Sequence, residues 1–243
     1  MRYGIFGDIH GNLHALEAVL EAYESESIDA YLCTGDLVGY GAYPRECIDR
    51  VRERCPGRVV AGNHDFAVCE KLTLEFFNSY AKSAVLWTRQ NLTDDHLAYL
   101  QALPLTVEVD KDTTLSHATL YDAHAFDYIQ TQYDAHLSLQ ELQTRCGFVG
   151  HSHIPIAFYL KDGMVNWTME TVIDLGDCEK ALINVGSVGQ PRDENPKAAY
   201  AIFDTDEATV SIKRVEYDVE SAIRAIESNQ LPRILGERLR LGK

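Results

Sequence analysis

The sequence predicts an α/β fold that contains two β-sheets. In the first part of the chain, short apolar runs alternate with helical stretches, which is typical of a mostly parallel sheet. From residue 105 onward, strand-like runs recur with fewer helices between them, which indicates a second sheet. The 243 residues, 46% of them hydrophobic, are enough for one large core, and no linker, repeat or low-complexity run divides them. We therefore expect one domain over residues 1–243.

The expected elements follow in chain order. A strand over 3–6 leads to a helix from Leu13 to about Glu24, for which Asn12 supplies the cap and apolar residues at helical spacing supply the buried face. A second strand ends at Asp36, a helix begins near Pro44, and a third strand, over 58–61, ends before Asn63. Residues from about 66 to 103 are expected to form a helical insertion. The later strands are expected at 105–109, 113–115, 148–149, 156–160, 182–185, 200–203 and 209–215, and the closing helices at 219–228 and 231–241.

Five short segments carry most of the side chains that bind metals well. Each segment follows a predicted strand, and the carboxyl ends of strands in an open α/β sheet converge on one crevice. Two segments contain donors two residues apart, and along an extended strand such pairs point to the same face. We therefore expect nitrogen and oxygen donors to meet at one site. The segments are Asp8-Ile9-His10, Gly35-Asp36, Gly62-Asn63-His64-Asp65, Ser116-His117 and Gly150-His151-Ser152-His153.

The order of these segments resembles the calcineurin-like metallophosphoesterase superfamily, and in particular its bacterial phosphodiesterase branch. The superfamily pattern is Asp-x-His, Gly-Asp, Gly-Asn-His-Asp/Glu, a His usually followed by Gly, and Gly-His-x-His. The chain departs from it only at Ala118, where glycine is usual and where both residues are small. Further stretches at 35–41, 77–81, 87–89 and 184–192 also agree. The resemblance covers about residues 1–242 and is weakest in a variable segment at about 120–143.

The resemblance implies a four-layer α/β/β/α sandwich of two mixed sheets, the metallo-dependent phosphatase fold. It also implies two divalent transition-metal ions as cofactors. Such ions, about 3.5–4 Å apart, stabilise both the attacking and the departing oxygen, and they lower the pKa of a shared water so that hydroxide attacks phosphorus directly. Imidazole and carboxylate donors without thiolate suit Mn, Fe, Zn, Ni or Co better than Mg or Ca. The implied donors are Asp8, His10 and His153 for one ion, Asn63, His117 and His151 for the other, and Asp36 as the bridge.

Four further residues are candidates for catalysis or substrate binding. The resemblance implies that His64 stabilises or protonates the leaving oxygen and that Asp65 orients its ring. Tyr40 and Arg192 follow glycine-rich segments, and an arginine fork suits a phosphate group, so both are candidate substrate contacts. Structural alternatives remain open: His64 fits a purely structural bond to Asp65, and the glycines of 186–189 fit a tight turn as well as an anion site.

The segment after His117 and three further histidines also lead to predictions. The aromatic and polar segment 121–128 comes directly after the donor His117, so it either walls the site or forms an ordinary packed loop. His14, His96 and His136 lie in predicted helices, and we expect them to face solvent or to lie just outside the donor set.

Charge and composition limit the partners. A formal net charge of −15 opposes long polyanions, so the expected partner is a small phosphorylated substrate and long nucleic acid is disfavoured. The sequence shows no leader-like start and no stretch approaching 18 apolar residues, which predicts a cytoplasmic protein without a membrane partner. The six cysteines lack C-x-x-C spacing and are expected to be reduced structural thiols. The oligomeric state stays open.

The resulting hypothesis is a two-metal phosphoesterase that acts on a small phosphodiester or a nucleotide-like phosphate. A nuclease of the same superfamily is one alternative. A non-catalytic metal-binding interaction scaffold is another, although the complete donor set and His64 argue against it. A protein phosphatase is disfavoured because 243 residues leave little chain for a long peptide groove.

Overall fold

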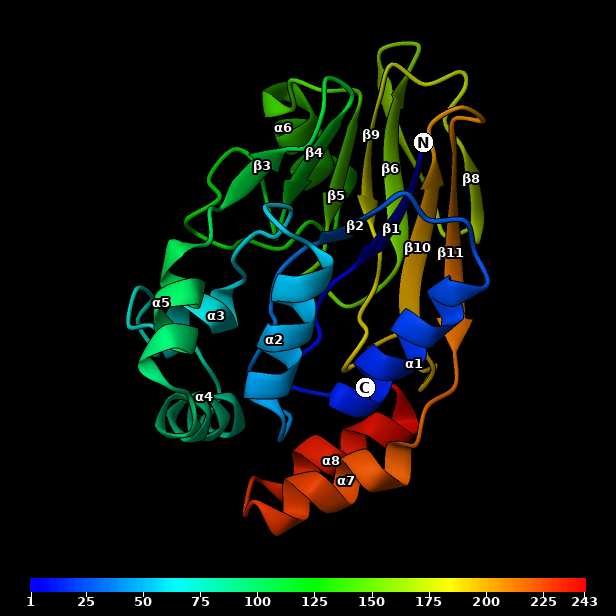
Figure 1. Ribbon diagram of the computed structural model, residues 1–243. Helices are drawn as coiled ribbons and strands as arrows, with labels where there is room; N and C mark the ends of the chain where they lie inside the picture. The colour runs from blue at the N-terminus through cyan, green and yellow to red at the C-terminus, as the bar shows by residue number, and fades with distance from the viewer.

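The computed structural model describes residues 1–243 and contains two mixed β-sheets (Figure 1). In the five-stranded sheet the order is β2-β1-β10-β11-β8, with only β1 and β2 parallel. In the six-stranded sheet the order is β3-β4-β5-β9-β6-β7, with β4, β5 and β9 parallel. The strands are β1 Arg2–Phe6, β2 Ala30–Cys33, β3 Thr106–Glu108, β4 Thr113–Ser116, β5 Cys146–Val149, β6 Ile156–Lys161, β7 Met164–Thr168, β8 Val172–Asp174, β9 Lys180–Asn184, β10 Ala198–Asp204 and β11 Thr209–Val215.

Helices cover the outer faces of the two sheets. Helix α1 packs on β10 and β11, and α6 packs on β6, β7 and β9. Figure 1 shows α7 and α8 side by side at one end of the molecule, next to α1. The helices are α1 Leu13–Glu24, α2 Pro44–Arg54, α3 Asn63–Val68, α4 Ser79–Asn91, α5 Asp94–Ala102, α6 Gln132–Glu141, α7 Val219–Ser228 and α8 Arg233–Leu241. None of them has both the length and the apolar character that crossing a bilayer requires.

Three apolar cores separate the four layers. Side chains alternate across β1, so Tyr3 and Ile5 pack with Phe148 of β5 in the core between the sheets. Phe6 lies in a second core, between the five-stranded sheet and its helices. A third core joins α6 to the outer face of the six-stranded sheet. The predicted α/β/β/α sandwich of two mixed sheets is therefore confirmed.

Several elements differ from the expectations. The third predicted strand is wrong: Val59 forms only an isolated parallel bridge with Cys33, because the chain then turns away and Ala61 N donates to the Pro104 oxygen at 2.8 Å. Strands β7 and β8 were not expected. Both lie at sheet edges, where exposed apolar residues such as Met164 and Trp167 blur the alternation that marks a half-buried strand. Helix α6 falls inside the variable segment 120–143.

Candidate metal centre

The predicted donors lie in loops that leave both sheets, except Asn63 at the start of α3, and they converge on one buried site. Two groups of side chains each have their donor atoms within 4.8 Å of one another, and Asp36 belongs to both groups. The Asp36 Oδ2 atom lies 3.5 Å from His10 Nε2 and 3.4 Å from His117 Nε2. On the His10 side, His153 Nε2 lies 3.0 Å from His10 Nε2 and 3.4 Å from Asp8 Oδ1. The groups are Asp8, His10, Asp36 and His153, and Asp36, His117 and His151, all of them buried.

Backbone carbonyls fix how three of the imidazoles point. Each donates its Nδ1–H to a carbonyl oxygen, which directs Nε2 to the centre. The pairs are His10 with Val38 (3.1 Å), His117 with Thr34 (2.7 Å) and His153 with Gln190 (2.6 Å). This orientation is the one that a metal-binding histidine needs.

Unpartnered atoms at the same site fit a bound cation. His117 Nε2 and Asn63 Oδ1 are buried and have no hydrogen-bond partner. A buried polar atom without a partner costs free energy, and a cation coordinated by these atoms would remove that cost. The donors are imidazole nitrogens, carboxylate oxygens and one amide oxygen, which suits a divalent transition metal. The residues therefore fit the two-metal set expected for this site.

Glycines and backbone amides hold the two carboxylates in place. Asp36 Oδ1 accepts the His64 N–H at 2.8 Å, and Asp8 accepts the His151 N–H at 3.0 Å. A Cβ atom at Gly62 would lie 2.0 Å from Asp36 Oδ1, and one at Gly150 would lie 2.4 Å from Asp8 Oδ2. Both positions therefore need glycine because a carboxylate occupies the space of a side chain.

The backbone at the donors is left-handed and not extended as expected. Strands β1 and β5 end at Phe6 and Val149, and the donor pairs lie in the loops beyond them. Such φ values in non-glycine residues cost of order 1–3 kcal/mol each and cluster at functional sites. The donors converge beyond the strand ends as predicted, but the extended backbone expected for the two donor pairs is wrong. The φ values are 47° at Asp8, 51° at His10, 51° at Asp36, 70° at His151 and 63° at His153.

Buried carboxylates and imidazoles shift one another's pKa values at this site. Burial opposes ionisation of Asp36, but His117, His64 and His10 together lower the pKa of Asp36 well below its usual range. Burial likewise favours neutral His117, yet Asp36 raises the pKa of His117 to about 9. Burial raises the pKa of Asp8 to about 7. The centre therefore keeps a negative charge at Asp36 that a nearby cationic group balances.

Asp65 does not hold the His64 ring, contrary to expectation. Its Oδ1 accepts the Leu37 N–H at 2.9 Å and the Val38 N–H at 3.3 Å, and its Oδ2 accepts the Gly62 N–H at 2.9 Å. Asp65 is the third residue of α3, so its carboxylate caps that helix and ties it to the Asp36 loop. His64 Nδ1 is buried without a partner, and burial lowers the pKa of His64 to about 4.

A cavity of about 430 Å³ opens over the donors and contains both predicted substrate contacts. Arg192 Nη2 lies 3.0 Å from Gln190 Oε1 and 3.5 Å from the Tyr40 hydroxyl. The Tyr40 ring centroid lies 4.5 Å from that of His64. The lining residues are Asp36, Tyr40, Asn63, His64, Leu72, Thr73, Phe76, Phe77, Asn78, Ala81, Ala125, Phe126, Asp127, Tyr128, His151, His153 and Arg192.

The aromatic part of this wall was missed by the donor pattern. The helical insertion expected over about 66–103 is interrupted at 69–78, where Phe76 and Phe77 come just before Asn78, the cap of α4. The segment 121–128 walls the site: Tyr128 stacks on His151, with ring centroids 4.1 Å apart and 17° between the planes. Phe76 lies four residues before Tyr80, a helical spacing that hid its place in the cavity wall.

The glycines of 186–189 form a structural turn. The Gly189 N–H donates to the Asp8 carbonyl at 2.9 Å, and a Cβ at Gly189 would lie 1.8 Å from the Ile9 oxygen. Ser187 Oγ also donates to the Asp8 carbonyl, at 2.8 Å. Of the two alternatives for this turn, these contacts favour close packing against the Asp8 loop.

The remaining histidines have separate outcomes. His136 is exposed on α6, and His14 is half-buried near His10, so both fit the expectation. The expectation for His96 is wrong. Its ring is buried between α5 and α2, with Nδ1 2.7 Å from Thr93 Oγ1 and Nε2 3.2 Å from Asp49 Oδ1. The polar sequence around His96 hid this contact between helices.

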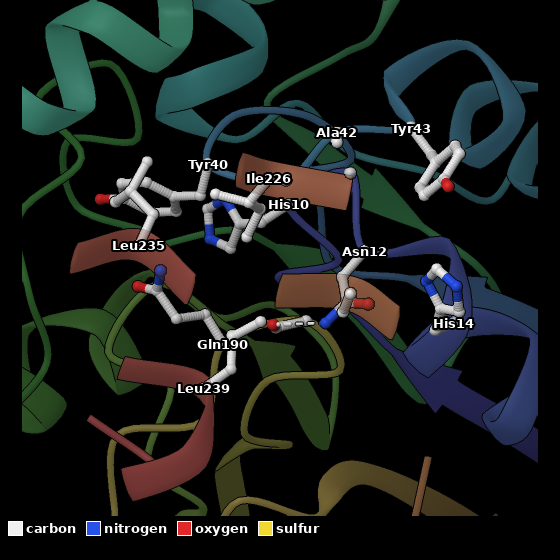
Figure 2. Close-up of a pocket in the computed structure, with 14 residues that line it drawn as sticks. His10, Asn12, His14, Tyr40, Ala42, Tyr43, Gln190, Ile226, Leu235 and Leu239 are labelled. Atoms are coloured by element: carbon white, nitrogen blue, oxygen red, sulfur yellow. Dashed lines mark hydrogen bonds between the residues drawn. The ribbon is translucent and has the colours of Figure 1, made fainter. Parts of the chain in front are cut away.

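The C-terminal helices α7 and α8 lie beside His10 of the metal centre (Figure 2). A cavity of about 10 Å³, room for about one water molecule, lies between His10 and apolar side chains of α7 and α8 such as Ile226 and Leu235. Figure 2 shows the hydrogen bond from Asn12 Nδ2 to the Gly189 oxygen, 3.0 Å long, beside this cavity. Helices α7 and α8 therefore lie close to His10, although they come more than two hundred residues later in the chain.

Comparison with known proteins gives the class of the molecule. Residues 1–208 match the model of the calcineurin-like phosphoesterase superfamily domain. The chain is 41% identical over 244 residues to the uncharacterised protein MJ0912 of Methanocaldococcus jannaschii, covering 98% of this chain and 97% of that one. A metallophosphoesterase crystal structure from Sphaerobacter thermophilus is 38% identical with a TM-score of 0.87, covering 100% and 99% of the two chains. The chain belongs to the calcineurin-like phosphoesterase superfamily.

A more distant structure agrees in fold. The hypothetical protein PH1004 of Pyrococcus horikoshii is 21% identical and has a TM-score of 0.79, covering 100% of this chain and 98% of that one. Membership of the superfamily supports a phosphoesterase hydrolase, and the clustered aspartates and histidines supply residues that could hold metal ions. Helices α7 and α8 lie beyond the part matched by the family model.

Proposed function

We propose that this protein is a two-metal phosphoesterase that hydrolyses a small phosphodiester or a nucleotide-like phosphate by direct attack of hydroxide on phosphorus. The observation that carries the proposal is that Asp36 belongs to both donor groups and also lines the 430 Å³ cavity. One ion would be held by Asp8, His10 and His153, the other by Asn63, His117 and His151, with Asp36 shared between them. Mn, Fe, Zn, Ni and Co are the candidate metals.

The bound ions would supply charge stabilisation for the attacking and departing oxygens. The other steps fall to side chains of the chain itself. Arg192 would bind the phosphoryl oxygens, since its Nε is buried without a partner and the Tyr40 hydroxyl lies 3.5 Å from its Nη2. His64 lines the same cavity and would donate a proton or a hydrogen bond to the leaving oxygen. Asp65 would act by positioning the Asp36 loop.

The size and charge of the site favour a small substrate. A cavity of about 430 Å³ is in the range of small-molecule sites, about 300–1,000 Å³. Arg192 is the one arginine or lysine in its lining, which leaves no basic track for a long polyanion. We further propose one domain over 1–243, with insertions at about 66–103 and 120–143, acting in the cytoplasm.

The test is a substrate screen of metal-reloaded protein. Protein treated with a chelator and reloaded with Mn²⁺, or with each other candidate metal, is assayed on phosphomonoesters, phosphodiesters, cyclic nucleotides and duplex DNA. Hydrolysis of a small phosphodiester that disappears on chelation is expected. A preference for DNA would make the protein a nuclease, and stoichiometric metal binding without any hydrolysis would make it a scaffold.

A further inference from the structure

Two aromatic rings line the substrate cavity without belonging to the apolar cores. The Phe76 side chain is 89% exposed, although it lines the cavity. Tyr128 is 45% exposed, and one face of its ring is stacked on His151. The outer face of Tyr128 therefore remains free. Exposed apolar surface that lines a ligand-sized cavity is typical of a binding site.

Neither ring is explained by the stability of the fold. Phe77, the neighbour of Phe76, packs against the apolar cores, whereas Phe76 does not. The two rings come from separate segments, 69–78 between α3 and α4 and 117–131 between β4 and α6. Both segments contribute residues to the lining of this cavity. Two unrelated loops thus each bring a flat apolar ring to the same opening.

We propose that Phe76 and Tyr128 bind a flat aromatic group of the substrate, so that the site takes phosphate esters of nucleosides. The inference rests on the proposed function, because the donors and Arg192 would take the phosphate while the rings take the base. Every nucleobase has a π-face, and base-aromatic stacking tightens binding by roughly 5- to 150-fold per base. The cavity of about 430 Å³ is large enough for a ligand of mononucleotide size.

The chemistry of the lining selects this class over an aliphatic phosphate ester. An aliphatic chain gains only from removal of apolar area from water, whereas a planar ring also gains from offset or edge contacts with Phe76 and Tyr128. Leu72, Phe77 and Phe126 extend the apolar part of the lining beside the two rings. The polar donors and the aromatic wall therefore match the two halves of a nucleoside phosphate.

The test compares binding of AMP and ribose 5-phosphate, which carry the same phosphate and sugar but differ in the base. Affinities are measured by calorimetry on metal-free protein, in which neither ligand is expected to be hydrolysed, so the result does not depend on turnover. We expect AMP to bind at least about 5-fold more tightly than ribose 5-phosphate. In Phe76→Ala the affinity for AMP should fall towards that for ribose 5-phosphate, which should itself be unchanged, and Phe76→Trp should restore the preference.

The matched control is Tyr133→Ala, which removes a ring that is 69% exposed on α6 and does not line the cavity. It should leave the preference for AMP intact. Equal affinities for the two ligands in the wild type, or an unchanged preference in Phe76→Ala, would overturn the inference. Failure of the proposed function would look different, because phosphoester hydrolysis would then be missing in the substrate screen while the preference for AMP persisted.

Discussion

At the scale of single residues, His64 is a buried side chain of the centre that is held by ring contacts. Its Nδ1 is buried without a partner, and its ring lies against Tyr40, His10 and Phe77. The neighbouring Asn63 occupies the position predicted to bind metal. His64 is therefore held by ring packing, which leaves its hydrogen-bonding capacity available for a substrate.

His64→Ala should slow hydrolysis of an alkyl phosphodiester by about 10²–10⁴-fold, the usual contribution of general acid catalysis, and keep both metals. The loss on a nitrophenyl phosphodiester should be much smaller, because that leaving oxygen departs without a proton. The rates and metal contents are measured on the same preparations, with His136→Ala as a control on exposed α6. Equal losses on both substrates with metals retained would place His64 in phosphoryl binding, and loss of a metal would make it a donor.

Gly62→Ala should empty the centre without removing any donor. The new Cβ would lie 2.0 Å from Asp36 Oδ1 and 2.4 Å from the Asp36 backbone nitrogen, so the shared carboxylate must move. Metal content after dialysis should fall well below that of the wild type. In Gly176→Ala the Cβ meets only the Asp174 side chain, at 3.1 Å, and metal content should not change. A Gly62→Ala protein with its full metal content would contradict the close packing described for this loop.

At the scale of elements, a side-chain contact ties β1 to the β3–β4 turn and thereby joins the two sheets. The Tyr3 hydroxyl donates to Asp110 Oδ2 at 2.6 Å. Burial opposes ionisation of Asp110, but hydrogen bonds from Tyr3 and from the turn lower the pKa of Asp110 below its usual range. Burial and Asp110 raise the pKa of Tyr3 to about 12.

The pH dependence of this contact has a definite sign. The lowered pKa of Asp110 adds stability above the unfolded value of about 3.9 and loses it as the pH falls through the folded value. The raised pKa of Tyr3 adds stability below about 10 and loses it as the pH rises toward 12. Asp110→Asn should therefore lower the midpoint of thermal unfolding at pH 7, with a difference from wild type that shrinks below pH 4. A constant difference across this range, or an equal effect of the exposed control Asp177→Asn, would contradict the assignment.

The elements also show which features the sequence could predict. Strand β11 and helix α7 have the predicted bounds, 209–215 and 219–228, because their apolar residues keep a clear period and Asp218 caps the helix. The donor segments could be found because their residue types and order are distinctive. Their left-handed backbone could not be predicted, because non-glycine residues such as Asp8 and His151 rarely adopt it.

The capping role of Asp65 could have been predicted from its position in the sequence. An acidic residue at the third position of a helix commonly caps the helix start, and Asp65 accepts the Gly62 N–H in this way. The family pattern alone does not distinguish this role from contact with His64. The aromatic wall from Phe76 and Tyr128 could not be predicted, because loops far apart in sequence bring these rings together.

At the scale of the whole molecule, the negative net charge favours small substrates over long polyanions. The net charge of −15 repels a long polyanion at distances where a small ester is little affected. At physiological salt we expect faster turnover of a small phosphodiester than of plasmid DNA, measured as phosphodiester bonds cleaved per enzyme per minute. Equal rates on the two substrates would show that charge does not govern substrate choice.

The proposed activity requires a centre in which Asp36 is shared by two ions. Its most direct test is metal analysis of the purified wild type and of Asp36→Asn, with Asp127→Asn as a control that lines the same cavity outside the donor groups. The wild type and Asp127→Asn should each bind two metal equivalents per chain and hydrolyse a small phosphodiester. Asp36→Asn should lose metal and activity together, because its carboxylate offsets the repulsion between the ions. Two full equivalents of metal in folded Asp36→Asn would contradict a centre in which both ions depend on Asp36.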